Sequence, residues 1–401
     1  MLSQGQPAAS GDFSLTAEYS TPYNAVIRGD VVLGVPRYFV ERWLPVLGPA
    51  PAALVTALRQ LDYRSAGDGV TIAGAALARE AAMSRRHLYT CLEAAWMPAF
   101  VRTTSGQRTQ ARNGTLQQQA NHYHVRMDDP LTPADADRLL VVLVSVADSP
   151  LDAARRALTL EPRTLWAANP AQPAERFAEP RAITARDVLQ RAFPTWAAAD
   201  EAEQQTFNEL ADALHRHVTL VRDDGRASKI IVPQYFRQRW WPRLGHDLAW
   251  SYLWLRGLVY DNPAEGIQRD TCWFPALEAL LTIIGRPREW WRRNVENARD
   301  SGEGWSLADF FRQTDAQKGR DPAHPQWVAR QFTVALQIPI APEDRARYAL
   351  LLRTWPPDGI SPASGAGSAT TKHTGRRGVR HSRAHRRTGG PPHSCTGVCH
   401  I

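Results

Sequence analysis

The chain reads Val35-Pro36-Arg37-Tyr38-Phe39-Val40-Glu41-Arg42-Trp43-Leu44-Pro45-Val46-Leu47-Gly48 near its start and repeats this stretch 197 positions later. The second copy is Val232-Pro233-Gln234-Tyr235-Phe236-Arg237-Gln238-Arg239-Trp240-Trp241-Pro242-Arg243-Leu244-Gly245, and nine of the fourteen residues are identical. The identities include Tyr, Trp and Pro. A match that is so dense in rare residue types is hard to obtain by chance. The repeat predicts two copies of one module.

The similarity extends over most of each copy. Leu58, Leu61 and Tyr63 recur at the same offset, and the run Pro130 to Asp135 recurs as Pro339 to Asp344 with the offset increased to 209. The twelve extra positions indicate longer loops in the second copy. Each copy spans roughly 120 residues, an ordinary domain size. We predict four regions: a first module at 20–148, a helical linker rich in Pro and Ala at 149–226, a second module at 227–356 and a disordered basic tail at 357–401.

Length and composition suit a globular protein with two cores. The chain has 401 residues, of which 43% are hydrophobic and 14 are Trp. No signal peptide is recognisable, and the longest apolar run, Leu139 to Ala147, is too short to cross a membrane. We therefore expect a cytoplasmic, nucleoid-associated protein without a membrane partner.

The net charge of +8 is concentrated in the tail. After Asp358 the chain has seven Lys or Arg and no Asp or Glu, which leaves about +1 on the rest. Nucleic-acid binding by the modules must therefore come from local basic patches. The tail lacks hydrophobic periodicity, so we predict disorder. It is either an arm that binds polyanions in a salt-dependent way or an extension without function.

The four cysteines do not predict a disulfide framework. Cys395 and Cys399 lie in the tail near His393 and His400, but zinc ligands usually come from ordered elements at shorter Cys spacing. Cys91 and Cys272 are isolated and are predicted to be small buried side chains. We expect no metal and no cofactor.

A candidate DNA-reading element lies in the first module, where the chain reads Leu77-Ala78-Arg79-Glu80-Ala81-Ala82-Met83-Ser84-Arg85-Arg86-His87-Leu88-Tyr89-Thr90-Cys91-Leu92. Leu77 and Ala78 suit the buried face of a first helix, and Ser84 suits the N-cap of a second. Leu88 and Leu92 form the inner stripe of that second helix. Its outward face is then made of Arg85, Arg86, Tyr89 and Thr90.

This layout matches the chemistry of base recognition. A helix in the major groove needs long donors near its start and an apolar rear face, and arginine can donate two hydrogen bonds to guanine. Six Arg and two Glu lie between Arg79 and Arg112. Over about 20 residues the segment resembles the helix-turn-helix of bacterial DNA-binding proteins, through its Leu-Ala pair, small turn residue, Met-Ser and two leucines. Alanine-rich helical hairpins that do not bind DNA share this pattern.

The second copy has a related segment, from Leu280 to Val295. Gly285 falls on the turn position of Ala82, and Trp291 falls on that of Leu88. The outward positions become Arg288, Glu289, Arg292 and Arg293. Two departures, Leu281 in place of the small residue and the bulky Trp290-Trp291 pair, leave open whether this copy binds DNA weakly or serves for dimerisation.

Each helical pair is followed by strand-like sequence that predicts a hairpin, or wing, able to follow the DNA backbone. In the first copy, Phe100 to Thr103 and His122 to Met127 flank a polar stretch. Arg102, Arg108 and Arg112 are its candidate DNA contacts. In the second copy, Phe332, Val334 and Leu336 form the matching strand, and Lys318, Gly319 and Arg320 are predicted in the preceding loop.

Two alternatives concern individual side chains. His122 and His124 share one strand face, which resembles the metal motif of nucleases that nick DNA through a tyrosine. The second copy has Gln331 and Thr333 there, so the strand does not require histidine. The repeated aromatic block is predicted to seal each core, with phosphate contacts by Arg42 and Arg239 as the alternative. A phosphate-binding glycine loop and a zinc-helix motif are absent from the sequence.

Together these features predict a mainly α fold with small β-wings (α+β), made of two winged-helix modules joined by a helical linker. This architecture is similar to that of bacterial plasmid or phage replication initiators and of tandem-module transcription regulators. The resemblance implies non-catalytic, sequence-specific binding of double-stranded DNA for replication initiation or transcription control. Metal-dependent nicking by His122 and His124, a protein-interaction scaffold and a homodimer remain alternatives. The predicted DNA contacts are Arg85, Arg86, Tyr89, Thr90, Arg102, Arg108, Arg112, Arg288, Arg292 and Arg293.

Overall fold

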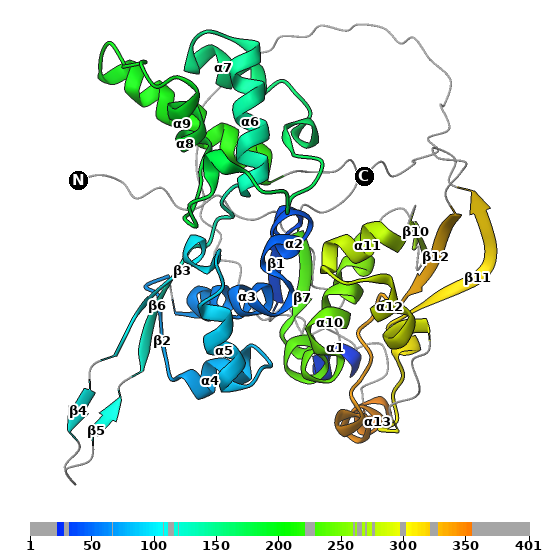
Figure 1. Cartoon of the computed structure of the whole chain (residues 1–401). Coiled ribbons are helices and arrows are strands. Elements are labelled where there is room, and N and C mark those ends of the chain that lie inside the picture. The colour runs from blue at the N-terminus through cyan, green and yellow to red at the C-terminus, as the bar shows by residue number, and fades with distance from the viewer. Residues whose placement is uncertain are drawn as a thin grey trace, which may run out of the picture.

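The protein is mainly helical with small antiparallel sheets, as the predicted α+β class requires (Figure 1). This description rests on a computed structural model that describes residues 22–27, 32–65, 67–106, 108–110, 116–118, 120–220, 229–259, 261–262, 267–268, 271–274, 277–296, 302–320 and 328–354. Among these residues, every helix is too short or too polar to span a lipid bilayer. The predicted disordered tail, with Cys395 and Cys399, lies outside the described residues.

The first half of the chain begins with a strand and a long helix and ends with a three-stranded sheet. Helix α3 starts after Gly48, whose φ of 80° turns the chain away from the preceding helix. The antiparallel sheet has the strand order β2-β6-β3. The elements are β1 (Val32–Pro36), η2 (Phe39–Trp43), α2 (Leu44–Leu47), α3 (Pro49–Arg64), β2 (Val70–Ile72), α4 (Gly74–Glu80), α5 (Arg85–Leu92), η3 (Met97–Ala99), β3 (Val101–Thr104), β4 (Arg108–Gln110), β5 (Leu116–Gln118) and β6 (Asn121–Val125).

The second half follows the same order of main elements. Gly245, the counterpart of Gly48, has a φ of 73° and bends the chain at the same place. The antiparallel sheet has the order β10-β12-β11. The elements are β7 (Lys229–Pro233), η6 (Phe236–Trp240), α10 (Trp241–Leu258), β8 (Asp261–Asn262), β9 (Ile267–Gln268), β10 (Thr271–Phe274), α11 (Leu277–Ile284), α12 (Arg288–Trp291), η8 (Arg292–Glu296), η9 (Leu307–Asp309), β11 (Phe311–Arg320), β12 (Val328–Val334), η10 (Pro342–Asp344) and α13 (Arg345–Thr354). Helix α1 (Pro22–Ile27) packs against α13.

The repeated aromatic block makes the same contacts in both halves. The Trp43 indole donates to the carbonyl of Pro130 at 2.6 Å, and the Trp240 indole donates to that of Pro339 at 2.6 Å. Trp43 packs edge-on against Phe100, with 4.8 Å between ring centroids, and the matching pair in the second half is separated by 4.9 Å. Both tryptophans are fully buried. The block therefore closes each core, as its sequence predicts.

The arginine of each block is tied to an acidic residue. Arg42 is buried and forms hydrogen bonds to both carboxylate oxygens of Asp135, which is itself fully buried. Arg239 pairs with Asp344 at 3.0 Å and is 44% exposed. The alternative that Arg42 contacts phosphate is wrong, because its guanidinium is enclosed by protein groups.

Between the halves the chain forms a helical unit, helices α6 to α9, which lies at the top of Figure 1. These helices pack on one another, with α6 against α7 and α8, and α9 against α7 and α8. The Thr184 hydroxyl and the Asp187 carboxylate cap α8 reciprocally, which fixes where this helix begins. The unit comprises α6 (Pro133–Val146), α7 (Pro150–Ala157), η4 (Pro162–Leu165), η5 (Glu175–Phe177), α8 (Ala185–Ala192) and α9 (Glu201–Thr219).

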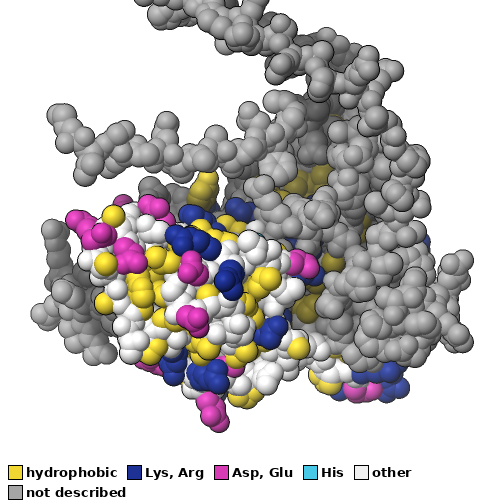
Figure 2. All heavy atoms as spheres, turned by 90° about the horizontal axis from the view of Figure 1, so that it is seen from above, with side chains coloured by type: hydrophobic (Ala, Val, Ile, Leu, Met, Phe, Trp, Pro, Cys, Tyr) yellow, Lys and Arg dark blue, Asp and Glu magenta, His cyan; other side chains and the backbone are white. Residues whose placement is uncertain are grey.

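The surface of the helical unit carries charges of both signs. In the view of Figure 2, from above Figure 1, basic, acidic and apolar side chains are interspersed on this face. Residues 133–220 contain 13 Asp or Glu and nine Arg, a net charge of −4.

Candidate nucleic-acid interface

The turn between α4 and α5 brings two short helices together. Ala82 has a φ of 52°, in the left-handed region, and the Met83 amide donates to the Ala78 carbonyl at 2.9 Å. This backbone hydrogen bond closes the end of α4. The Ser84 hydroxyl accepts from the His87 amide at 3.2 Å and starts α5, which is the N-cap role predicted for this serine.

The inner faces of both helices are apolar and buried. Leu77 and Leu88 are fully buried, and Ala78 is nearly so. Cys91 is buried as predicted, and burial raises the pKa of its thiol to about 11. The thiol is therefore protonated at neutral pH and packs in the hydrophobic core.

The outer face of α5 presents the predicted candidates together: Arg85, Arg86, Tyr89 and Thr90 are all exposed. The guanidinium carbon of Arg85 lies 5.9 Å from the centroid of the Tyr89 ring, a cation–π contact that directs it along the helix. Within the described part of the chain, no Asp or Glu forms an ion pair with Arg85 or Arg86. Two adjacent cations therefore lie exposed at the start of α5.

His87 is a further exposed residue of α5 that the sequence did not single out. Its ring lies 6.3 Å from that of His246, which directly follows the bend of α10 at Gly245 in the second half. Burial, and then the nearby His87, lower the pKa of His246 to about 4. Little in the sequence singles out His87, because its neighbour His246 lies in the other half of the chain and is brought close only by the fold.

The hairpin after α5 continues this surface. Arg102 is exposed on β3 and lies opposite His124 on β6. Strands β4 and β5 extend the hairpin away from the body at the lower left of Figure 1. Arg108 belongs to β4, without a described side chain, and Arg112 lies outside the described residues. Strand β6 ends at Val125, so the predicted strand was too long, and Met127 is 45% exposed.

His122 and His124 lie side by side, with 4.4 Å between their ring centroids. The Nδ1 atom of His122 is hydrogen-bonded to the Thr71 hydroxyl at 2.8 Å. In the described ranges, no third His, Cys, Asp or Glu joins them in a group that could hold a metal ion. Catalytic metal sites usually have three protein ligands, of which these two histidines would supply two.

The second half forms the same turn with different side chains. Gly285 has a φ of 63°, and the Arg286 amide donates to the Leu281 carbonyl at 2.9 Å. Trp291 is fully buried, with its ring 5.9 Å from Phe332 and 6.2 Å from Phe311. It therefore occupies the inner position that Leu88 has in the first half.

The outer face of the second helix is less positive. Arg288, Arg292 and Arg293 are exposed, as predicted for outward positions. Glu289 accepts two hydrogen bonds of 3.0 Å from Arg292 and pairs with Arg293 at 3.5 Å. The hydrogen bonds from Arg292 lower the pKa of Glu289. Lys318, Gly319 and Arg320 belong to strand β11, so their predicted place in a loop was wrong: the strand is extended past a register shift.

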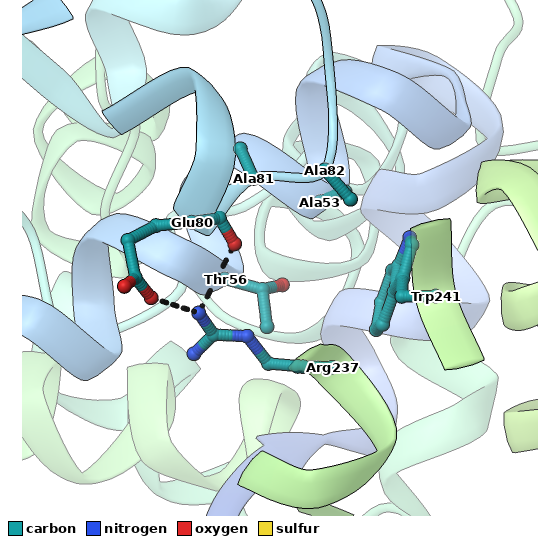
Figure 3. Close-up of a pocket in the computed structure, with 7 residues that line it drawn as sticks. All are labelled: Ala53, Thr56, Glu80, Ala81, Ala82, Arg237 and Trp241. Carbon is teal, nitrogen blue, oxygen red and sulfur yellow. Dashed lines mark hydrogen bonds and ion pairs between the residues drawn. The ribbon is translucent and has the colours of Figure 1, made fainter. Parts of the chain in front are cut away.

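A small cavity marks where α4 meets the second half (Figure 3). The Arg237 guanidinium donates to the Glu80 carbonyl and to its carboxylate, each at 3.2 Å. The cavity measures about 10 Å³, close to the space of one water molecule, so it is not a ligand site. Its lining residues are Ala53, Thr56, Glu80, Ala81, Ala82, Arg237 and Trp241.

Comparison with protein-family models, with curated proteins and with solved structures finds no match to this chain. The interpretation of the site therefore depends on its own geometry. That geometry gathers four predicted candidates on α5 and one on β3, and places three others on the corresponding surface of the second half.

Proposed function

We propose that the protein binds double-stranded DNA through two winged-helix modules, with α5 and the helix from Arg288 to Glu296 as recognition helices. The observation that carries the proposal is the face of α5, where Arg85 and Arg86 have no acidic partner among the described residues and the rear of the helix is buried. Such a helix offers free donors to base edges or phosphates in the major groove.

The order of elements supports a winged-helix assignment for each half. A helix, a strand, two helices joined by a tight turn and two strands follow one another, and the first strand pairs with the third at the sheet centre. The hairpin of the last two strands is then the wing. In the first half, Arg102 on this hairpin and Arg85 on α5 would contact the same stretch of DNA backbone.

The charge distribution supports the same assignment. Residues 22–130 contain twelve Arg and eight Asp or Glu, and the matching residues 229–340 contain 15 Lys or Arg and 12 Asp or Glu. The first half therefore has a net charge of +4 and the second +3, whereas the helical unit between them has −4. Electrostatic attraction would turn the two halves toward DNA and the helical unit away from it.

The proposal is tested by selecting bound duplexes from a random pool and measuring affinity by fluorescence anisotropy. For this experiment, each of the seven Lys and Arg residues of the tail is replaced by Gln in the full chain, so that tail charge does not contribute. We expect salt-dependent, sequence-selective binding by the native modules. The R85A/R86A variant should bind the selected site with at least tenfold lower affinity. The matched control, R176A/R186A, removes two exposed cations from the helical unit and should bind normally. Equal binding by both variants would overturn the proposal.

Within this proposal, replication initiation and transcription control are the two roles that the resemblance implies. Initiation requires that the bound site support replication of a plasmid in the presence of the protein. Control of transcription requires only that binding change the output of an adjacent promoter. Cloning the selected site into a plasmid without its own origin, and beside a reporter gene, separates the two.

A further inference from the structure

The two halves are joined by a strand pair with a symmetric register. Strands β1 and β7 are antiparallel, and Gly34 lies opposite Ile231. These two residues are also equivalents in the repeat, because they are 197 positions apart. Leu33 pairs with Val232, and Val35 pairs with Ile230. Ile230 is the repeat equivalent of Leu33, and Val232 is that of Val35, so exchanging the two halves turns one pair into the other. All five pairs of this ladder exchange in the same way, which is the pattern of an isologous interface.

A ladder of this kind has a local twofold axis through its central pair. Exchanging the two halves by a half-turn about Gly34 and Ile231 maps every backbone pair of the ladder onto another pair of the same ladder. The chain has therefore placed its two halves as a symmetric dimer places two subunits, although they belong to one polypeptide.

Contacts away from the ladder follow the same operation. Helix α3 packs on α10, its own repeat equivalent. Helix α11 packs on α2 and η2 of the first half. The reciprocal contact is the one in Figure 3, where Glu80 at the end of α4 meets Arg237 on η6. Since α4 corresponds to α11, and η6 to η2, each half places the first helix of its helix pair against the opening helix of the other half.

The axis determines how two recognition helices can meet one duplex. Double-stranded DNA itself has twofold axes between base pairs, and a protein with twofold-related reading helices matches half-sites in inverted orientation. We propose that a single chain of this protein recognises an imperfect inverted repeat in DNA, with α5 reading one half-site and the helix from Arg288 to Glu296 reading the other. This inference rests on the proposed function.

The two half-sites differ in sequence because the reading surfaces differ. Arg85, Arg86, Tyr89 and Thr90 face outward in the first half, whereas Arg288, Glu289, Arg292 and Arg293 do so in the second. A carboxylate between arginines restrains the guanidinium groups and can itself accept a hydrogen bond from cytosine. The first half-site is therefore expected to contribute more of the affinity, and the second more to discrimination.

The separation of the half-sites is fixed because the halves are held by buried contacts. The Trp250 indole donates to the Pro49 carbonyl at 3.0 Å, and Arg237 holds Glu80. Both donors are almost completely buried. Two helices in successive major grooves on one side of DNA read half-sites about 10 base pairs apart from centre to centre.

The test uses the full chain with the neutralised tail and the duplexes that it selects. The expected consensus has two half-sites in inverted orientation. Reversing one half-site in place, with the spacing and base composition kept, should lower affinity at least tenfold, as should inserting five base pairs between the half-sites. R85A/R86A should abolish base preference in one half-site, and R292A/R293A should abolish it in the other, with R176A/R186A as the control for lost charge.

The outcomes separate this inference from the proposed function. Sequence-selective binding to a single half-site, or equal affinity for direct and inverted orientations, overturns the inverted repeat and leaves DNA binding intact. Loss of preference in the same half-site for both double variants overturns it as well. Absence of any selective binding overturns both.

Discussion

Arg237 on η6 and Glu80 at the end of α4 lie 157 positions apart in the chain and form a paired hydrogen bond across the two halves, with 3.2 Å to the Glu80 carbonyl and 3.2 Å to its carboxylate. Burial lowers the pKa of Arg237 to about 10, and the charge of Glu80 partly offsets this effect. The guanidinium therefore remains charged at neutral pH. The residue before the turn to α5 is thus anchored by the other half.

Replacing Arg237 by Ala tests this anchor. Glu80 keeps part of its hydration, so we expect a loss of about 1–3 kcal/mol in the free energy of unfolding, less than for a fully buried pair. Urea unfolding followed by tryptophan fluorescence measures it. Arg353→Ala, at an exposed position of α13, serves as the control and should change stability by less than about 0.5 kcal/mol. Equal effects at both positions would contradict the anchor.

Ala82 and Gly285 occupy equivalent turn positions with a positive φ, so substitutions at the two positions should change stability in opposite directions. Ala82→Gly should stabilise the protein by about 1 kcal/mol, because glycine adopts a φ of 52° without the steric cost of a Cβ atom. Gly285→Ala should destabilise it by about 1 kcal/mol, and since no atom lies within 4 Å of the added Cβ, the cost is conformational only. Thermal unfolding of both variants gives the comparison. A shift of the same sign in both would show that the turns are not equivalent.

The repeated acidic residues should differ in importance. Asp135 is fully buried and accepts hydrogen bonds from Tyr38 at 2.7 Å and from Arg42, so Asp135→Asn leaves a buried guanidinium without its counter-charge. We expect a loss of about 3–5 kcal/mol. The partner of Asp344, Arg239, is 44% exposed, so solvent screens that pair and Asp344→Asn should cost about 1 kcal/mol. Chemical denaturation of both variants measures the loss in the free energy of unfolding. Equal losses would contradict the predicted difference between the two environments.

His246 makes the interface between the halves sensitive to acid. Burial, and then the neighbouring His87, lower its pKa from 6.5 to about 4, while Asp247 acts in the opposite direction. Between these values the unfolded chain takes up a proton and the folded chain does not, so stability present at neutral pH is lost as the pH falls from 6.5 toward 4.

The corresponding experiment compares unfolding at pH 7 and pH 5 in the native chain and in His246→Gln, whose side-chain oxygen can still accept from the Trp241 indole. We expect the native chain to lose on the order of 1–2 kcal/mol more than the variant over this interval. An identical pH dependence would show that other groups dominate.

Glu289 should limit DNA binding by the second half. It neutralises part of the charge of Arg292 and Arg293, so under the proposed function Glu289→Gln should raise DNA affinity about three- to tenfold at low salt. Anisotropy titrations at several salt concentrations measure the change. Glu209→Gln, which removes the same charge from an exposed position of α9, is the control and should have a much smaller effect.

Features that depend on neighbours along the chain were predictable from residue type and spacing. The repeat identified the two aromatic blocks, and Ser84 identified the start of α5. Leu77 and Leu88 were correctly assigned to the buried faces of the helix pair. The periodicity of helices and the hydrogen bonds of caps are local, and residue type is sufficient to indicate them. The errors concerned the ends of strands. Strand β6 ends earlier than predicted, and Lys318 to Arg320 belong to strand β11 and not to a loop.

Contacts between distant groups became visible only with the two halves folded and packed together. The fold enclosed Arg42 against Asp135, set Arg237 on Glu80, paired β1 with β7 about Gly34 and Ile231, and packed helices α6 to α9 on one another. The amino-acid sequences of β1 and β7 do not specify that these strands pair, because an edge strand can pair with any other strand of suitable register. The pairing is fixed by the simultaneous burial of α3 against α10, which requires both halves to be folded and in place.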